Sequence, residues 1–273
     1  MKRAVFFLSD RTGITVEMMG QSLLTQFESV EFEQINLPFI DTVEKAEAAV
    51  TRVNAAAEET GNKPLVFSTL IDETVREVVA QSKGILFDMF NTFTPLLEAE
   101  LGMPSSRAVG RSHGMGVYAT YKARIDALNF ALNNDDGCNL RQFHEADIIL
   151  LGVSRSGKTP TCLYLALQYG ILAANYPLID NDLESTRLPE VLEPYRQKLF
   201  GLTISPERLQ NIRTERRAGS NYATYEQCQF EVSTVEKMYK AQQIPFLDTS
   251  AISIEEIATT ILHRSGLKRK LHG

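Results

Sequence analysis

The chain has 273 residues, with 28 basic and 34 acidic side chains and a formal net charge of −6. Hydrophobic residues make up 44% and charged residues 23%, which excludes a disordered, collagenous or coiled-coil chain as the overall description. At about 150 residues per domain, the length predicts one large or two modest domains.

The acidic excess lies in the first part of the chain. Residues 1–144 hold 13 basic and 19 acidic side chains, whereas residues 145–273 hold 15 of each. A net acidic chain is a poor general binder of nucleic acid, and the one basic run, at residues 268–270, is more typical of a solvated helix end. No apolar run approaches the roughly 20 residues of a membrane span. We therefore expect a cytoplasmic protein without nucleic-acid or membrane partners, and leave open whether it forms a homodimer.

The first half alternates between strand-like and helix-like segments. Short apolar runs predict strands at residues 4–8, 32–39, 65–69 and 85–89. Helical spacing predicts helices at residues 12–27, 43–59, 73–81 and 91–101. Strands separated by helices form βαβ units with a parallel sheet.

A glycine-rich stretch at residues 102–125 interrupts this pattern and carries Arg111 and His113. Because the stretch is polar, we expect a substrate loop with His113 as a candidate catalytic residue, although a structural role for this histidine stays open. A helix at residues 121–132 follows. The next five residues, 133–137, are typical of a turn, so we place a domain boundary near residue 144.

The alternation restarts in the second half. Strands are predicted at residues 146–151, 174–179, 199–204 and 244–247, with helices at 159–169, 232–242 and 254–262. Ser253 and Glu256 predict a capping box at the last helix. The predicted fold is α/β, with a parallel-sheet βαβ domain over residues 1–144 and a P-loop kinase-like domain over residues 145–273. The first domain is a candidate for binding phosphate or a target.

One motif carries most of the functional argument. The sequence pattern Gly-x-x-x-x-Gly-Lys-Thr is matched without exception by Gly152, Val153, Ser154, Arg155, Ser156, Gly157, Lys158 and Thr159. An apolar run precedes the motif and a helical segment follows it, as a phosphate-binding loop requires. Backbone N–H groups and the helix N-terminus would bind nucleotide phosphates, with Lys158 on the terminal phosphates and the Thr159 hydroxyl on Mg²⁺. The alternative is an ordinary strand-to-helix turn with an exposed lysine.

Other polar groups could complete a nucleotide site. A mobile lid that neutralises phosphate is one interpretation of the arginine-rich segment with Arg208, Arg213, Arg216 and Arg217, and a solvated charged helix is the other. Asp180 and Asp182 follow a predicted strand, where ligands bind in open α/β sheets. Asp182 is thus a candidate for holding Mg²⁺ or accepting a hydroxyl proton, with plain turn acidity as the alternative.

The loop at residues 9–15, which follows the first predicted strand, could hold a phosphate, such as that of a flavin. Helix capping by Thr12 is at least as good an explanation of these residues.

The chain resembles the phosphoenolpyruvate synthase regulatory proteins, a family of bifunctional serine/threonine kinases and phosphorylases related to the pyruvate, phosphate dikinase regulatory proteins. The resemblance covers nearly the whole chain and rests on Ser9, Asp10, Thr12, Gly20 and residues 111–114, 135–137, 151–161, 174–177, 198–204, 206–209 and 255–258. Dikinase-type members usually lack the second glycine of the loop, so Gly157 favours the synthase branch.

The resemblance implies two opposed activities on one protein substrate, phosphoenolpyruvate synthase. The family phosphorylates a target threonine with ADP as donor, which inactivates the target. It also removes that phosphate with inorganic phosphate as acceptor, which releases pyrophosphate and restores activity. From residue type and position we expect Lys158, Asp182, His113 and Arg208 to be catalytic, with Mg²⁺ on Thr159 and Asp182. A P-loop kinase of a small metabolite or nucleotide, and a non-catalytic nucleotide-gated regulator, are the alternatives.

Overall fold

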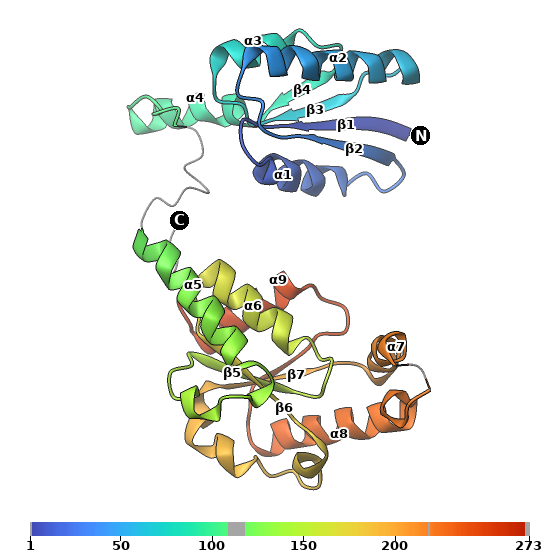
Figure 1. Ribbon diagram of the computed structural model, residues 1–273, viewed down its shortest axis with the longest axis vertical. Helices are drawn as coiled ribbons and strands as arrows, with labels where there is room; N and C mark the ends of the chain where they lie inside the picture. The colour runs from blue at the N-terminus through green and yellow to red at the C-terminus, as the bar shows by residue number, and fades with distance from the viewer. Residues whose placement is uncertain (1, 109–117, 218, 271–273) are drawn as a thin grey trace. The chain divides into compact units, whose positions relative to one another are not determined.

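The computed structural model describes residues 2–108, 118–217 and 219–270. The chain divides into two compact units, Met1–Gly114 and Met115–Gly273, each with a four-stranded parallel sheet (Figure 1). The predicted α/β class with two parallel-sheet domains is therefore confirmed. In the described part of the chain, no helix is both long enough and apolar enough to cross a membrane.

The first unit has the strand order β2-β1-β3-β4. Its elements are β1 Lys2–Leu8, α1 Ile14–Leu24, β2 Glu31–Leu37, α2 Val43–Thr60, β3 Leu65–Ser68, α3 Glu73–Ala80, β4 Ile85–Asp88 and α4 Met89–Leu101. Alternate residues of a strand point to opposite faces of a sheet. Accordingly, Phe6 and Leu8 of β1 pack with α2 and α3, whereas Val5 and Phe7 pack with α1 (Figure 1).

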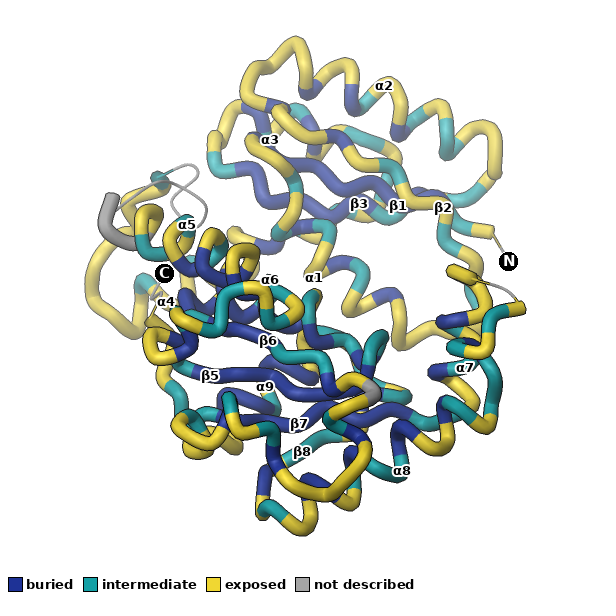
Figure 2. The backbone as a smooth tube through the Cα atoms, turned by 60° about the horizontal axis from the view of Figure 1, so that its bottom comes forward, coloured by how far each residue is buried: buried dark blue, intermediate teal, exposed yellow. Residues whose placement is uncertain are grey.

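The second unit has the strand order β6-β5-β7-β8. Its strands are β5 Ile148–Gly152, β6 Ala173–Pro177, β7 Leu199–Thr203 and β8 Phe246–Asp248, and its helices are α5 Tyr118–Asn133, α6 Lys158–Tyr169, α7 Pro206–Arg216, α8 Tyr225–Ala241 and α9 Ile254–Ser265. Helices α5, α6 and α9 share one core with Ile148 and Leu150, and α7 and α8 share the other with Ile149 and Leu151. The central strands β5 and β7 are buried throughout, whereas the edge strand β8 is partly exposed, as are the outer helix faces (Figure 2).

Short 3₁₀ helices fill the connections of the second unit. They are η1 Asp135–Gly137, η2 Leu140–Gln142, η3 Asp180–Leu183, η4 Glu190–Lys198 and η5 Asn221–Ala223. Of these, η1 lies before β5, and η3 is the first element after β6.

The boundary between the units falls before α5, and not near residue 144 as expected from the turn-like composition. Ala127 and Ala131 of α5 belong to the same buried cluster as Leu165 of α6. The turn after α5 is also tied into the second sheet, because the Asn175 N–H on β6 donates a hydrogen bond to the Asn134 carbonyl at 3.2 Å. The turn composition therefore marks a bend inside the unit.

Local hydrogen bonds explain two helix starts. Helix α8 begins at Tyr225, seven residues before the predicted start at 232, because the Thr224 hydroxyl accepts the Gln227 N–H at 3.3 Å. The capping box predicted for α9 is confirmed: the Glu256 carboxylate accepts the Ser253 N–H at 2.8 Å, and the Ser253 hydroxyl accepts the Glu256 N–H at 3.3 Å.

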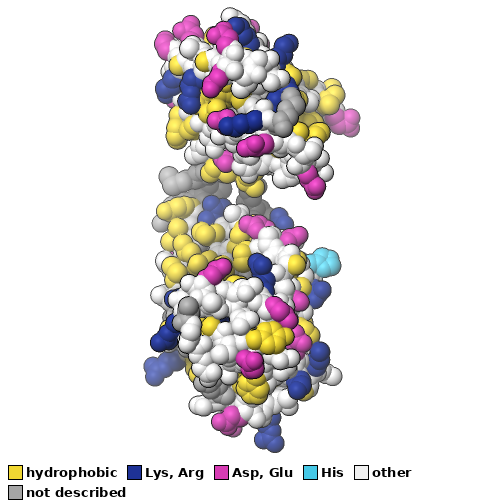
Figure 3. All heavy atoms as spheres, turned by 90° about the vertical axis from the view of Figure 1, so that its right-hand side faces the viewer, with side chains coloured by type: hydrophobic (Ala, Val, Ile, Leu, Met, Phe, Trp, Pro, Cys, Tyr) yellow, Lys and Arg dark blue, Asp and Glu magenta, His cyan; other side chains and the backbone are white. Residues whose placement is uncertain are grey.

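The basic run at residues 268–270 packs against its own unit. The Lys270 ammonium lies 2.6 Å from the Asp147 carboxylate, and the Arg269 guanidinium lies 4.8 Å from the ring centre of Tyr169. Two of the three charges thus have partners beside β5 and α6. On the face drawn in Figure 3, basic and acidic side chains are interspersed on each unit.

Candidate phosphate site

Both sheets reverse their strand order at their first strand, so β1 lies between β2 and β3, and β5 lies between β6 and β7. Ligands of open α/β sheets bind outside the carboxyl ends of the strands at such a switch point. The loop that leaves β5 at this point is the glycine motif, and it leads directly into α6, which begins at Lys158. The fold therefore places the motif where a phosphate loop belongs.

The loop backbone adopts a conformation suited to binding an anion. Gly157, the N-cap of α6, has φ 89°, and Arg155 has φ 78°, so two left-handed residues are separated by one. Alternation of this kind turns successive N–H groups toward one side and forms a concave anion site, which the N-terminus of α6 reinforces. No atom lies within 4 Å of a Cβ built on Gly157, so the glycine is needed for its backbone angle alone.

Packing requires the first glycine. A Cβ on Gly152 would lie 2.5 Å from the Ser156 hydroxyl oxygen and 2.7 Å from the Leu202 carbonyl oxygen. The far side of the loop is also held, because the Thr249 hydroxyl after β8 shares its proton between the Ser156 carbonyl at 3.2 Å and the Thr203 carbonyl of β7 at 3.0 Å. The loop is therefore fixed from β7 and β8 as well as by its own sequence.

Lys158 is buried, with 4% of its surface exposed, and its ammonium donates to the Val153 carbonyl of the same loop at 3.0 Å. Burial lowers the pKa of Lys158 from 10.5 to about 8, an effect that nearby carboxylates, Asp136 first, partly oppose. An anion in the loop would favour the charged form of this lysine. An ordinary strand-to-helix turn would leave this lysine exposed, whereas Lys158 is buried.

The hydroxyl of Thr159 donates to the Asp135 carboxylate at 2.8 Å. The same carboxylate oxygen accepts the Asn175 side-chain N–H at 2.5 Å, and the Asn175 side-chain oxygen accepts the Asp136 N–H at 3.1 Å. Sequence reasoning placed Asp135 and Asp136 in a turn and among the residues of the family resemblance, but it gave neither a role in the site. Asp136 stands in the left-handed region at φ 48°, which is uncommon for a residue other than glycine and is often found at functional sites.

Asp182 lies on η3, directly after β6, the neighbour of β5. Its carboxylate accepts the Ile179 N–H at 3.1 Å, which is the turn role considered as the alternative. Burial raises the pKa of Tyr176 on β6, and the negative charge of Asp182 raises it further. Asp182 thus stands after the carboxyl end of β6, while the partner of Thr159 is Asp135.

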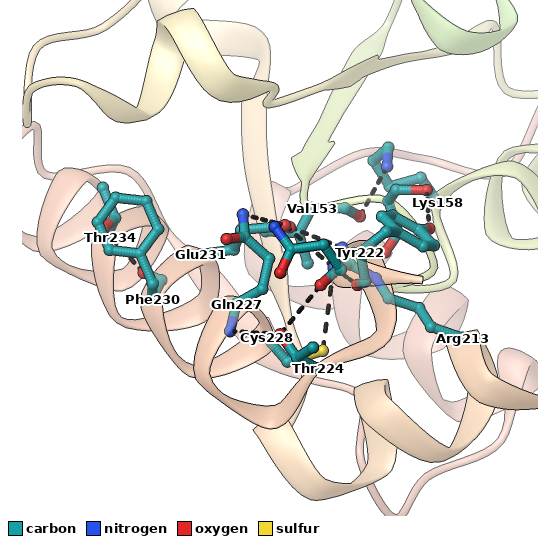
Figure 4. A network of polar contacts seen from close by, with 12 residues as sticks. Val153, Lys158, Arg213, Tyr222, Thr224, Gln227, Cys228, Phe230, Glu231 and Thr234 are labelled. Atoms are coloured by element: carbon teal, nitrogen blue, oxygen red, sulfur yellow. Dashed lines mark hydrogen bonds and ion pairs between the residues drawn. The ribbon is translucent and has the colours of Figure 1, made fainter. Parts of the chain in front are cut away.

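The arginine-rich segment forms helix α7, and its arginines differ in environment. Arg213 is fully buried and forms an ion pair with Glu231 of α8 at 2.6 Å. Figure 4 shows Arg213 beside Glu231 and Tyr222, and its guanidinium donates to the Tyr222 carbonyl at 3.0 Å. It also donates to the Ser154 carbonyl at 3.1 Å. Arg213 is therefore a structural anchor of the loop after β5, and both interpretations of the segment, a mobile lid and a solvated helix, are wrong for this residue.

The Tyr222 hydroxyl donates to the Ser154 hydroxyl at 2.8 Å, and the Arg213 guanidinium stacks 3.9 Å from the centre of the Tyr222 ring. Ser154, the second residue after β5, is thus held by hydrogen bonds to both its backbone carbonyl and its side-chain hydroxyl. Arg208 and Arg216 on α7 are exposed, as is Arg217 directly after the helix, so these arginines of the segment remain available to a ligand.

The loop after β1 occupies the matching position in the first unit. Gly13, with φ 81°, is the N-cap of α1, so Thr12 does not cap this helix as the structural alternative required. Ser9 and Asp10 are buried, and the Thr69 hydroxyl donates to the Ser9 hydroxyl at 3.2 Å. Position 14, which corresponds to Lys158, is an isoleucine.

Arg111 and His113 lie outside the described residues. Within the described ranges, no group of three or more His, Cys, Asp or Glu side chains gathers as a metal site.

Comparison with known proteins identifies relatives along the whole chain. A sequence profile described as kinase/pyrophosphorylase matches residues 5–262. Proteins provisionally named phosphoenolpyruvate synthase regulatory protein are 54% identical in Hahella chejuensis and in Legionella pneumophila strain Corby, in each case over 99% of this chain and 100% of the relative. One from Marinobacter nauticus is 52% identical over 98% of this chain and 99% of the relative. The chain belongs to the kinase/pyrophosphorylase family.

Proposed function

We propose that this chain regulates phosphoenolpyruvate synthase by reversible phosphorylation of a threonine. In one direction, the terminal phosphoryl group of ADP passes to the threonine hydroxyl, which leaves AMP and inactivates the target. In the other, inorganic phosphate takes the phosphoryl group from phosphothreonine, which releases pyrophosphate and restores the target. The family membership and the names of the relatives support this assignment.

The observation that carries the proposal is the buried Lys158 at the start of α6, within a glycine loop at the switch point of the sheet. Phosphoryl transfer depends mainly on positioning and on neutralising charge. The N–H groups of the loop would bind the phosphates, and the Lys158 ammonium would exchange the Val153 carbonyl for a phosphate oxygen. A neutral substrate would not compensate the free-energy cost of burying the Lys158 ammonium.

The remaining roles follow from what surrounds the loop. The threonine hydroxyl must give up its proton, and the carboxylates of Asp182 and Asp136 are the candidates to accept it. Arg208, exposed on the first turn of α7, would add positive charge. Oxygen ligands suit Mg²⁺, and the half-buried Thr159 hydroxyl beside a carboxylate fits that requirement. When bound, Mg²⁺ would neutralise charge on the phosphates.

The test is direct. The purified chain is incubated with Mg²⁺, ADP and phosphoenolpyruvate synthase, and the synthase is then searched for phosphothreonine by mass spectrometry. We expect phosphothreonine with ADP, and pyrophosphate when phosphorylated synthase meets inorganic phosphate. Lys158→Met should abolish both, whereas Lys240→Met, which removes an exposed lysine of α8, should abolish neither.

Two outcomes would favour the alternatives. Transfer to a free metabolite in the absence of the synthase would indicate a small-molecule kinase. Tight ADP binding with no transfer from any nucleotide would indicate a non-catalytic regulator. Transfer from ATP but not from ADP would correct the donor.

A further inference from the structure

The hydroxyl of Thr159 has one proton, and the structure shows where it goes. Thr159 donates it to Asp135 at 2.8 Å, and a carboxylate can only accept. The lone pairs of the hydroxyl oxygen are therefore turned away from Asp135. In phosphate loops the hydroxyl after the lysine serves the cation that accompanies the nucleotide, and a cation needs lone pairs.

Hydrogen bonds from β6 fix the position of Asp135. It lies on η1, and Asn175, which is fully buried on β6, fastens this turn to the sheet by three hydrogen bonds. One of them is donated by the Asn175 amide directly to the Asp135 oxygen that also binds Thr159. Strand β6 pairs with β5 on the side opposite β7. Because Asn175 lies on β6, its hydrogen bonds fix the Asp135 carboxylate relative to β5, the strand that leads into the loop.

We infer that Asp135 is a positioning residue of the phosphate site, which orients the Thr159 hydroxyl toward a divalent cation and supplies the negative charge that favours this cation. The inference rests on the proposed function, since it assumes that the loop binds nucleotide phosphates. It replaces the expected pairing of Thr159 with Asp182 by a contact that the structure contains. Asp135 acts through Thr159 and need not touch the nucleotide.

The charge of Asp135 should affect the affinity for ADP in opposite directions with and without Mg²⁺. Near phosphates, a carboxylate repels ADP when no cation is present and favours ADP when Mg²⁺ is bound with it. Asp135→Asn keeps an oxygen that can accept from both Thr159 and Asn175, so it removes the charge and preserves the shape. Without metal, ADP should bind this variant as tightly as the wild type or more tightly; with Mg²⁺, it should bind more weakly.

The experiment measures the Kd of ADP by titration calorimetry, in Mg²⁺ and in EDTA, for the full-length chain. The readout is the metal preference, defined as the Kd in EDTA divided by the Kd in Mg²⁺. We expect Asp135→Asn to lower it about tenfold, the scale of one charge-assisted hydrogen bond. Thr159→Val, which removes the hydroxyl that Asp135 orients, should also lower it.

Asp147→Asn is the matched control, because Asp147 belongs to the same unit, is paired with Lys270, and lies at the amino end of β5, opposite the end that leads into the loop. It should keep the wild-type preference. An equal fall in Asp147→Asn, or an Asp135→Asn variant whose affinity for ADP falls equally with and without metal, would each overturn the inference alone. A wild-type chain that binds no ADP would overturn the proposed function together with it.

Discussion

Replacing Arg213 by methionine should destabilise the second unit by about 3–5 kcal/mol, the usual cost of removing one partner of a buried ion pair. The size follows from what the guanidinium holds. Its side chain is 0% exposed and that of Glu231 is 9% exposed, so the variant leaves a carboxylate buried without a cation. The carbonyls of Ser154 and Tyr222 lose their donor as well.

The partner substitution separates this charge effect from lost packing. Arg213→Met combined with Glu231→Met removes both charges and keeps apolar volume, and replacements of that kind are often neutral or stabilising. The double variant should therefore be more stable than Arg213→Met alone. It should still bind ADP less tightly than the wild type, because the Ser154 carbonyl of the phosphate loop has no anchor in either variant.

Hydrogen exchange followed by mass spectrometry is the suitable assay, because the chain has two units and no tryptophan. The slowest amides of β5 and β7 report the free energy of unfolding of the second unit by itself. Those of β1 and β3 serve as the internal control and should not change. A cost below about 1 kcal/mol for Arg213→Met, or a double variant less stable than it, would refute the reasoning.

Three further predictions concern single positions. Gly157→Ala should lower the stability of the second unit by about 1–2 kcal/mol through left-handed backbone strain alone. Gly152→Ala should lower the stability more, because its Cβ would lie 2.7 Å from the Leu202 carbonyl oxygen, and a lower melting temperature for Gly157→Ala than for Gly152→Ala would contradict this. Because the pKa of Lys158 is about 8 in the free chain and an anion raises it, ADP binding between pH 8 and 10.5 should take up protons. Calorimetry in buffers of different ionisation enthalpy measures this uptake. Lys158→Met should abolish it, and equal uptake by this variant would assign the proton to another group. Burial raises the pKa of Asp10, so at pH 7 its ionised form is disfavoured in the folded state, and Asp10→Asn should raise the melting temperature of the first unit; a lower value would show that the charge is compensated.

The phosphate loop could be found from the sequence because its requirements are local. An apolar strand, two glycines, a lysine and a helix lie within about twenty consecutive residues, and the structure forms them as expected. The left-handed angle at Gly157 is also local, since it follows from the start of α6. Alternation of apolar and helical segments likewise predicted all eight strands of the two sheets.

The groups that hold the loop could not be found in the same way, because they are distant in sequence. Asp135 reaches the loop from η1 and Arg213 reaches it from α7, and these contacts depend on tertiary packing that composition does not report. An arginine in a charged segment looks the same in sequence whether it is exposed, as Arg208 is, or completely enclosed, as Arg213 is.

The division before α5 has a practical meaning for anyone who wishes to separate the two halves. A fragment that starts at residue 145 would lose α5 and η1, expose the face of α6 that Ala127 and Ala131 cover, and leave Asn175 without its partners. A fragment that starts before Tyr118 keeps the loop, Thr159 and Asp135 in one piece of chain. Whatever chemistry the phosphate loop performs, its immediate supports are encoded in a single contiguous stretch, which could be transplanted, tethered or swapped between relatives as one part.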